Sequence, residues 1–174
     1  KMTSSQTFNT ASSTVLSATS YEIGVDGQSR AASQTDLLTG AVTNFSYNST
    51  NNQMTGSVTA LNGRTLASST YSIGVDGQAR IATQTDIDLN VTTFNYAANN
   101  QMNSSVTVGP TGTTLSTSNY ELGIDGRARI ANQTDTLLGN VTTFTYNQAN
   151  NKMTSSQTTN TASGTLLTTT AYEI

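Results

Sequence analysis

Acidic and basic side chains recur at a fixed spacing, and their types and positions make them the residues of this chain best suited to chemistry. The motif Asp-Gly-x-x-Arg occurs three times, and a further aspartate follows each arginine after six residues. The motif residues, named here the charge ladder, are Asp26, Gly27, Arg30, Asp76, Gly77, Arg80, Asp125, Gly126 and Arg129, and the later acids are Asp36, Asp86 and Asp135. Rows of carboxylates could bind Ca²⁺, but a calcium loop gathers more acids in one place. We therefore expect hairpin turns in which arginines offset like charges across the strands.

Composition argues against catalysis. The chain has no His and no Cys, which removes the commonest general base, the usual metal ligands and the thiolate nucleophile. The repeated acids could be taken as a glycosidase pair, but they occur in every repeat and no cleft-forming segment flanks them. We predict a protein that is not an enzyme and that uses no cofactor.

Charge and hydropathy exclude two classes of partner. Seven scattered basic residues and a net charge of −3 give no electrostatic footprint for nucleic acid. The chain contains no run of 18 apolar residues, so we predict no membrane insertion. Only 10% of the residues are charged and 34% are hydrophobic, which favours thin structures held by ladders of hydrogen bonds over a thick apolar core.

The elements that must position these residues repeat about every 50 residues. Tyr21, Tyr71, Tyr120 and Tyr172 mark the period, and residues 1–23 are identical to residues 152–174 at 17 of 23 positions. We expect small length differences between repeats to fall in turns. The chain then divides into a partial repeat at 1–23 and repeats at 24–73, 74–122 and 123–174, which we interpret as one continuous array cut from a longer protein.

Each repeat predicts about four β-strands, because turn signals separate short segments rich in β-branched and aromatic residues. In the last repeat region we expect strands at 113–122, 127–134, 141–146 and 152–158, with a Gly-Ile-Asp-Gly turn at 123–126. Asp-Gly pairs favour tight hairpins, because Gly accepts a positive φ without steric cost. The predicted fold is all-β, an array of antiparallel hairpins.

Aromatic residues alternate along several of the expected strands. In Thr43-Phe45-Tyr47 they share one face and Val42 points to the other, so neither face is uniformly polar and we expect a sheet covered on both sides. Stacking of equivalent rings from successive repeats would add about 0.5–1.5 kcal/mol per contact. This structural aromatic ladder consists of Phe45, Tyr47, Phe94, Tyr96, Phe144, Tyr146, Tyr21, Tyr71, Tyr120 and Tyr172.

The segment from Leu138 to Ser155 resembles the YD repeat of Rhs proteins, teneurins and insecticidal-toxin shells, whose pattern is roughly GNxxxYxYDxxGrlts. The resemblance implies a long sheet of β-hairpins that winds into a spiral, a tube or a β-solenoid. The chain departs from the pattern at two positions. The Asp after the second aromatic residue is replaced at Asn48, Ala97 and Asn147, and the later Gly is replaced at Asn52, Asn100 and Asn151.

These features predict a structural protein that forms an extracellular filament, sheath or stalk. It would do so either as a homo-polymer, with other copies of itself as the partner, or as one long single-chain array. One alternative is the shaft of a cell-surface adhesin. Another is a fragment of an Rhs-type toxin-encapsulating shell, although the DPxGR-like segment of such shells is not present. Glycans could be attached at the sequons Asn44, Asn48, Asn90, Asn103, Asn132 and Asn140. We expect an extracellular or cell-surface location.

Overall fold

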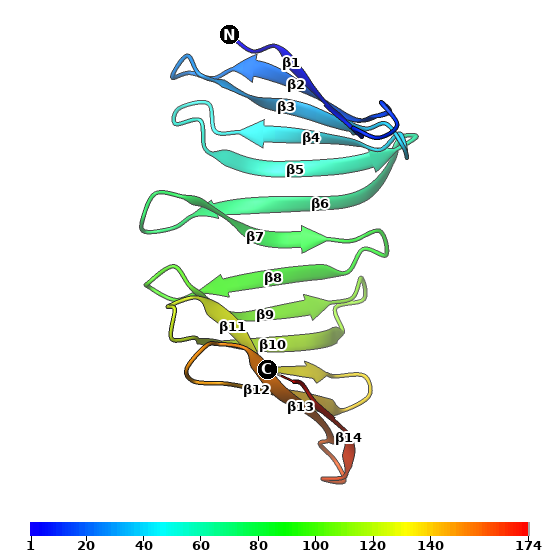
Figure 1. Cartoon of the computed structure of the whole chain (residues 1–174), viewed down its shortest axis with the longest axis vertical. Coiled ribbons are helices and arrows are strands. Elements are labelled where there is room, and N and C mark those ends of the chain that lie inside the picture. Colours follow the sequence, from blue (N-terminus) through cyan, green and yellow to red (C-terminus); the bar gives the residue numbers. More distant parts are fainter. Residues whose placement is uncertain (174) are drawn as a thin grey trace. The chain divides into compact units, whose positions relative to one another are not determined.

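The computed structural model describes residues 1–173, which form fourteen β-strands and no helix (Figure 1). Ile174, the last residue of the predicted repeat 123–174, lies outside the described residues. The strands are β1 (Ser4–Phe8), β2 (Val15–Ile23), β3 (Ser29–Asp36), β4 (Val42–Tyr47), β5 (Met54–Leu61), β6 (Arg64–Ile73), β7 (Ala79–Thr85), β8 (Val91–Tyr96), β9 (Met102–Val108), β10 (Thr114–Leu122), β11 (Ala128–Asp135), β12 (Asn140–Tyr146), β13 (Met153–Asn160) and β14 (Leu166–Ala171). In the part of the chain described, no helical segment has the length and apolar character needed to cross a membrane.

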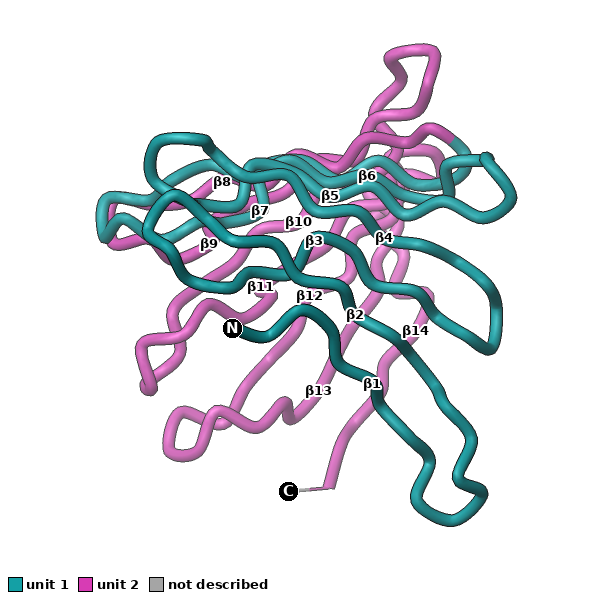
Figure 2. The backbone as a smooth tube through the Cα atoms, turned by 90° about the horizontal axis from the view of Figure 1, so that it is seen from above, with its two compact units in different colours: residues 1–88 teal, residues 89–174 magenta. Residues whose placement is uncertain are grey.

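The chain forms two compact units, one from Lys1 to Asp88 and one that begins at Leu89 (Figure 2). In unit 1, strands β1 to β7 pair with their chain neighbours in antiparallel order. In unit 2, strands β8 to β14 do the same. The predicted all-β array of antiparallel hairpins, with four strands in each 50-residue stretch, is confirmed. Winding into a spiral, tube or solenoid stays a prediction.

The strand positions expected for the last repeat region are confirmed to within two residues. Strands β10 to β13 run from Thr114 to Asn160, with boundaries close to those that the turn signals indicate. The predicted location of length differences is also confirmed by the turns. The turn after Tyr47 is closed by a bond from Asn52 N to Asn48 O, whereas the equivalent turn after Tyr96 is one residue shorter and is closed by Asn100 N and Ala97 O.

The hairpins that carry Asp-Gly close with a four-residue turn. Gly27 N donates to Gly24 O at 2.9 Å, and Gly24 N donates to Gln28 O at 2.9 Å. Gly27 takes the positive φ of 74°, whereas Asp26 does not, so this is not the two-residue turn in which both central residues need positive φ. The same bonds close the turn at 123–126, which confirms the predicted Gly-Ile-Asp-Gly turn.

β-Bulges recur at the tyrosines. The register between paired strands shifts just before each of six tyrosines. These are Tyr21, Tyr47, Tyr71, Tyr96, Tyr120 and Tyr146. In each case the extra residue lies on the partner strand, opposite the tyrosine, so it is the partner strand that the bulge bends. The tyrosine spacing in the sequence therefore marks a backbone irregularity as well as a side chain.

The sheets lack an apolar core. No hydrophobic side chain among residues 1–173 is buried, and large aliphatic side chains such as Leu38 and Val75 are 69% and 82% exposed. On β4, Phe45 and Tyr47 are half-buried while Asn44 and Ser46 are exposed, which confirms that the aromatic residues share one face. The expectation of a sheet covered on both sides is wrong for the described chain, because each unit is a single sheet whose polar side chains tolerate water.

Candidate functional site

Charge-ladder arginines and aromatic-ladder tyrosines meet at the same place in both units. We name these groups arginine clusters and define each by four side chains. The unit 1 cluster is Glu22, Arg30, Tyr47 and Asn52, and the unit 2 cluster is Glu121, Arg129, Tyr146 and Asn151.

Three strands and one turn position the unit 1 cluster. Glu22 near the end of β2 lies directly across from Arg30 near the start of β3, because the short hairpin fixes their register. Tyr47 is the last residue of β4 and lies opposite a bulge in β5, and Asn52 lies in the turn between β4 and β5. Three consecutive strands and the turn that follows them are thus connected around one guanidinium.

The arginine uses both its donors and its flat face. Arg30 Nε donates to Glu22 Oε1 at 2.8 Å, and Nη1 donates to Asn52 Oδ1 at 2.6 Å. The guanidinium carbon lies 4.2 Å from the centre of the Tyr47 ring, within cation–π range. Its side chain is 21% exposed, so water screens these contacts only partly.

The unit 2 cluster has the same geometry. Arg129 Nε donates to Glu121 Oε1 at 2.9 Å and Nη1 donates to Asn151 Oδ1 at 2.7 Å. The guanidinium again lies 4.2 Å from the centre of a ring, that of Tyr146. At 12% exposure, Arg129 is the more enclosed of the two arginines.

Each cluster tyrosine also holds the neighbouring backbone. Tyr47 Oη donates to the carbonyl of Ala31 at 2.8 Å, and Tyr146 Oη donates to that of Ile130 at 2.7 Å. Partial burial raises the pKa of both tyrosines above the usual value, and the nearby arginine opposes this rise. The phenols therefore remain protonated donors at neutral pH.

The side chain of each cluster asparagine lies close to the glycine that begins an Asp-Gly turn. Asn151 has a φ of 60°, a conformation that Asn tolerates better than most residues, and its Oδ1 also accepts a bond from Ile124 N at 3.0 Å. A Cβ added to Gly123 would lie 2.7 Å from that oxygen. Gly24 has the same relation to Asn52, at 2.6 Å. These glycines are needed because the asparagine side chain approaches the backbone closely.

The arginine of the third copy of the motif pairs with a different carboxylate. The position of Glu22 and Glu121 is occupied by Ser72, which cannot pair with a guanidinium as a carboxylate does. Arg80 turns to Asp76, with Nη1 to Oδ1 at 2.7 Å and Nη2 to Oδ2 at 2.5 Å. These hydrogen bonds lower the pKa of Asp76 to about 2.

The remaining charge-ladder acids stabilise turns. Asp26 and Asp125 accept backbone N–H groups two residues ahead, from Gln28 at 2.9 Å and Arg127 at 3.2 Å. Of the later acids, Asp36 accepts bonds from Leu38 N and Thr39 N, which lower its pKa. Among residues 1–173, no three His, Cys, Asp or Glu side chains are grouped closely enough to hold a metal ion.

The aromatic ladder is distributed over alternate strands. Its members are Tyr21 on β2, Phe45 and Tyr47 on β4, Tyr71 on β6, Phe94 and Tyr96 on β8, Tyr120 on β10, Phe144 and Tyr146 on β12, and Tyr172 just after β14. Phe45, Phe94 and Phe144 each lie opposite a serine on the next strand. Tyr21 Oη shares a hydrogen bond with Ser5 Oγ at 3.0 Å. Ring stacking between successive repeats stays a prediction.

The sequence reasoning missed four cluster residues. Glu22 and Glu121 were not singled out, although each follows a period-marking tyrosine as Tyr-Glu. Asn52 and Asn151 were noted only as departures from the YD pattern. Their replacement of Gly is the usable signal, because a left-handed position filled by Asn retains the backbone turn and adds a side-chain oxygen.

Solved structures of Tc toxin chains are similar to the chain at low identity. The crystal structure of TcdB2-TccC3-Cdc42 is 16% identical with a TM-score of 0.48, over 87% of this chain and 9% of that chain. The crystal structure of TcdB2-TccC3 is 15% identical with a TM-score of 0.43, over 95% and 12%. A Tc holotoxin pore from Photorhabdus luminescens is 15% identical with a TM-score of 0.42, over 94% and 11%.

The chain spans about a tenth of the length of these structures. No protein-family model and no curated protein matches the chain. The resemblance to YD repeats therefore stays a prediction.

Proposed function

We propose that this chain is a non-enzymatic structural protein, an array of β-hairpins that stacks into an extracellular filament, sheath or stalk. The observation that carries the proposal is the arginine cluster. The same four side chain types, with distances that agree to within about 0.1 Å, connect three consecutive strands and the following turn in both units.

Repetition of local contacts can replace a core. A partly exposed ion pair contributes about 0.2–1 kcal/mol and a cation–π contact about 0.5–1 kcal/mol, so each cluster contributes about 1–2 kcal/mol. In an array whose elements contact only their neighbours, such terms add along the chain. This arrangement suits a long, water-exposed structure that need not enclose a substrate.

The partner in this proposal is another copy of the same array, at an extracellular or cell-surface location. Neither nucleic acid nor a membrane interior has a role. The adhesin shaft and the toxin-shell fragment are the alternatives that the experiment must separate.

Electron microscopy of the purified chain and of native source material tests the proposal. Uniform filaments, with an axial repeat equal to a whole number of 50-residue repeats, are the expected result. Hollow particles would indicate the shell, and short monomeric rods would indicate the adhesin shaft. The double variant Arg30→Ala/Arg129→Ala should give shorter or irregular filaments, whereas Arg64→Ala/Arg127→Ala, which changes two exposed arginines outside the clusters, should not.

A further inference from the structure

Each unit carries a groove at equivalent positions on the sheet. The grooves have volumes of about 440 Å³ in unit 1 and 420 Å³ in unit 2. The unit 1 groove is lined by Leu16, Ser17, Gln34, Asp36, Thr43 and Thr59, together with Leu38. The unit 2 groove has the same residue types at seven positions 99 residues later, namely Leu115, Ser116, Gln133, Asp135, Leu137, Thr142 and Thr158. The linings differ at Ala41 of unit 1, which corresponds to Asn140 of unit 2, and Thr134 lines the unit 2 groove alone. Volumes of this size are typical of small-ligand sites.

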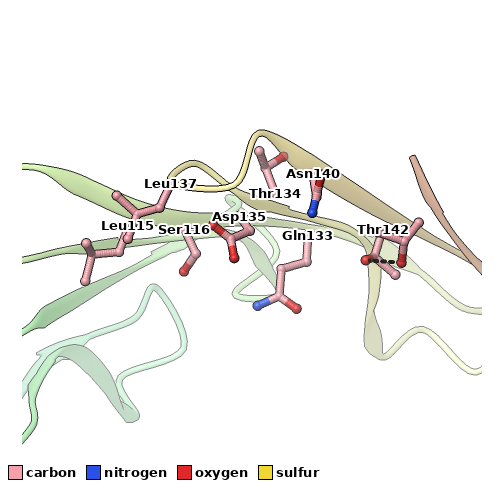
Figure 3. A pocket seen from close by; sticks show the side chains of 9 residues that line it. Leu115, Ser116, Gln133, Thr134, Asp135, Leu137, Asn140 and Thr142 are labelled. Atoms are coloured by element: carbon pink, nitrogen blue, oxygen red, sulfur yellow. Dashed lines mark hydrogen bonds between the residues drawn. The ribbon is translucent and has the colours of Figure 1, made fainter. Parts of the chain in front are cut away.

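One side of each groove is apolar. Leu115 and Leu137 lie together at one end of the unit 2 groove (Figure 3). Leu38 and Leu137 are 69% and 66% exposed, although they are large aliphatic side chains. Such a surface is suited to the C–H face of a ligand, whose contact would remove these leucines from water.

The other side offers hydroxyl and amide groups. Thr142 and Thr158 share a hydrogen bond at 2.9 Å, and Gln133 projects between them and the leucine end (Figure 3). In unit 1 the equivalent hydroxyls of Thr43 and Thr59 share a bond at 2.8 Å. Only one hydroxyl of each pair donates to the other, so the second retains a donor, and the glutamine amide both donates and accepts.

The charge in the groove selects among ligand classes. No Lys or Arg lines either groove, so an anionic ligand would find no cation. The single carboxylate, Asp36 or Asp135, already uses one oxygen to accept a backbone N–H in the adjacent turn. One carboxylate is too few for a metal site, but its second oxygen can accept hydrogen bonds from hydroxyl groups.

We infer that both grooves bind a neutral, hydroxyl-rich saccharide. Its C–H face packs on the leucines, and its hydroxyls bond to the glutamine amide, the free threonine hydroxyl and the aspartate. The inference does not depend on filament formation, because each groove lies within one unit.

The experiment titrates the full chain with neutral oligosaccharides, namely maltohexaose, cellohexaose and chitohexaose, and follows the side-chain amide signals of Gln34 and Gln133 by NMR. A sulfated oligosaccharide is the charged comparison. We expect at least one neutral oligosaccharide to shift both signals while Gln6, outside the grooves, stays unchanged. Gln34→Ala/Gln133→Ala should weaken binding about five- to tenfold, the effect of one lost hydrogen bond per groove.

Two further variants keep the test decisive. Leu38→Ser/Leu137→Ser changes exposed side chains and should also weaken saccharide binding several-fold. If the glutamine variant does not fold, this leucine variant alone tests the groove. Asn44→Ala/Thr143→Ala changes exposed residues next to Thr43 and Thr142 but on the opposite face, and should leave binding unchanged. No binding at millimolar saccharide, binding of the sulfated oligosaccharide alone, or unchanged affinity in both groove variants would overturn the inference. Filaments seen by microscopy would be unaffected by any of these results.

Discussion

Single residues decide which carboxylate each repeated arginine pairs with. Where the preceding strand supplies Glu22 or Glu121, the arginine binds across the hairpin and lies over a tyrosine. Where that strand supplies Ser72, Arg80 binds Asp76 in its own turn. The Asp-Gly-x-x-Arg motif is therefore the same in sequence but its arginine pairs with a carboxylate from a different position.

Replacing Arg129 by Lys tests the cluster at its centre. An ammonium group can keep the Glu121 pair but loses the flat face over Tyr146 and the Nη1 bond to Asn151, so unit 2 should lose about 1 kcal/mol. The measurement is urea denaturation combined with hydrogen exchange at Ile124 N, which bonds to Asn151. Arg127→Lys is the matched control, because Arg127 is exposed two residues away. Equal effects of the two changes would argue against the cluster.

Replacing Gly123 by Ala tests the close approach of Asn151. The new Cβ would lie 2.7 Å from Asn151 Oδ1, so the asparagine must move and release both Arg129 and Ile124. We expect a loss of about 1–3 kcal/mol in the natural background and a smaller loss beside Asn151→Gly, which removes the clash. The double-mutant cycle from denaturation midpoints measures this coupling. Purely additive effects would contradict the proposed contact.

The Asp76 carboxylate predicts a local pH dependence. Its pKa falls from 3.8 to about 2 in the folded chain, because Arg80 and the Gln78 N–H bind the charged form. A lowered folded-state pKa gives stability that is present above pH 3.8 and is lost as the pH falls toward 2. Asp76→Asn should reduce the decline of the thermal midpoint in this window, whereas Asp26→Asn, which leaves Arg80 bound, should reduce it less. The reverse order would exclude this pairing as the cause.

At the scale of elements, turns and bulges determine the pairing. Each Asp-Gly hairpin uses a four-residue turn that ends in a glycine of positive φ, and bulges in the partner strands lie opposite six tyrosines. The hairpin between β5 and β6 is tighter. Leu61 pairs with Arg64, and the two residues between them, Asn62 and Gly63, have φ values of 51° and 79°, as a type I′ turn requires.

This turn predicts a difference between two substitutions at Gly63. Gly63→Ala should destabilise the β5–β6 hairpin by about 1 kcal/mol, because a Cβ disfavours the left-handed conformation. Gly63→Asn should cost less, since Asn adopts that conformation more readily. Space is not the cause, because a Cβ here would meet nothing within 4 Å. Hydrogen exchange of the β5 and β6 amides measures both, and equal loss in the two variants would contradict the turn assignment.

At the scale of the whole molecule, hydrogen-bonded ladders take the place of a core. The described residues bury no hydrophobic side chain, and the most buried polar ones are Ser105 and Ser118, at 7% exposure each. Hydroxyl pairs such as Thr43 with Thr59 and Thr142 with Thr158 hold neighbouring strands. Stability should then depend on many weak contacts between neighbouring strands.

The missing core predicts an unusual calorimetric signature. Exposure of apolar surface raises the heat capacity on unfolding and exposure of polar surface lowers it, so the increment should lie below the usual value of about 12–15 cal/mol/K per residue. Differential scanning calorimetry at several protein concentrations measures it. A heat-capacity increment in the usual range at every protein concentration would contradict this prediction, because it would mean that unfolding exposes as much apolar surface as in a protein with a core.

The sequence by itself determined the strands, the antiparallel order and the turns, because alternation, β-branched segments and Asp-Gly pairs act over a few neighbouring residues. It also placed the aromatic residues of β4 on one face, since alternate strand residues point the same way. Only the tertiary structure decided that Arg30 meets Tyr47 and Asn52, residues 17 and 22 positions away, and that leucines and threonines of three strands and one turn line one groove. Those meetings depend on bulges and register, which bring distant side chains together by backbone geometry that no local pattern encodes.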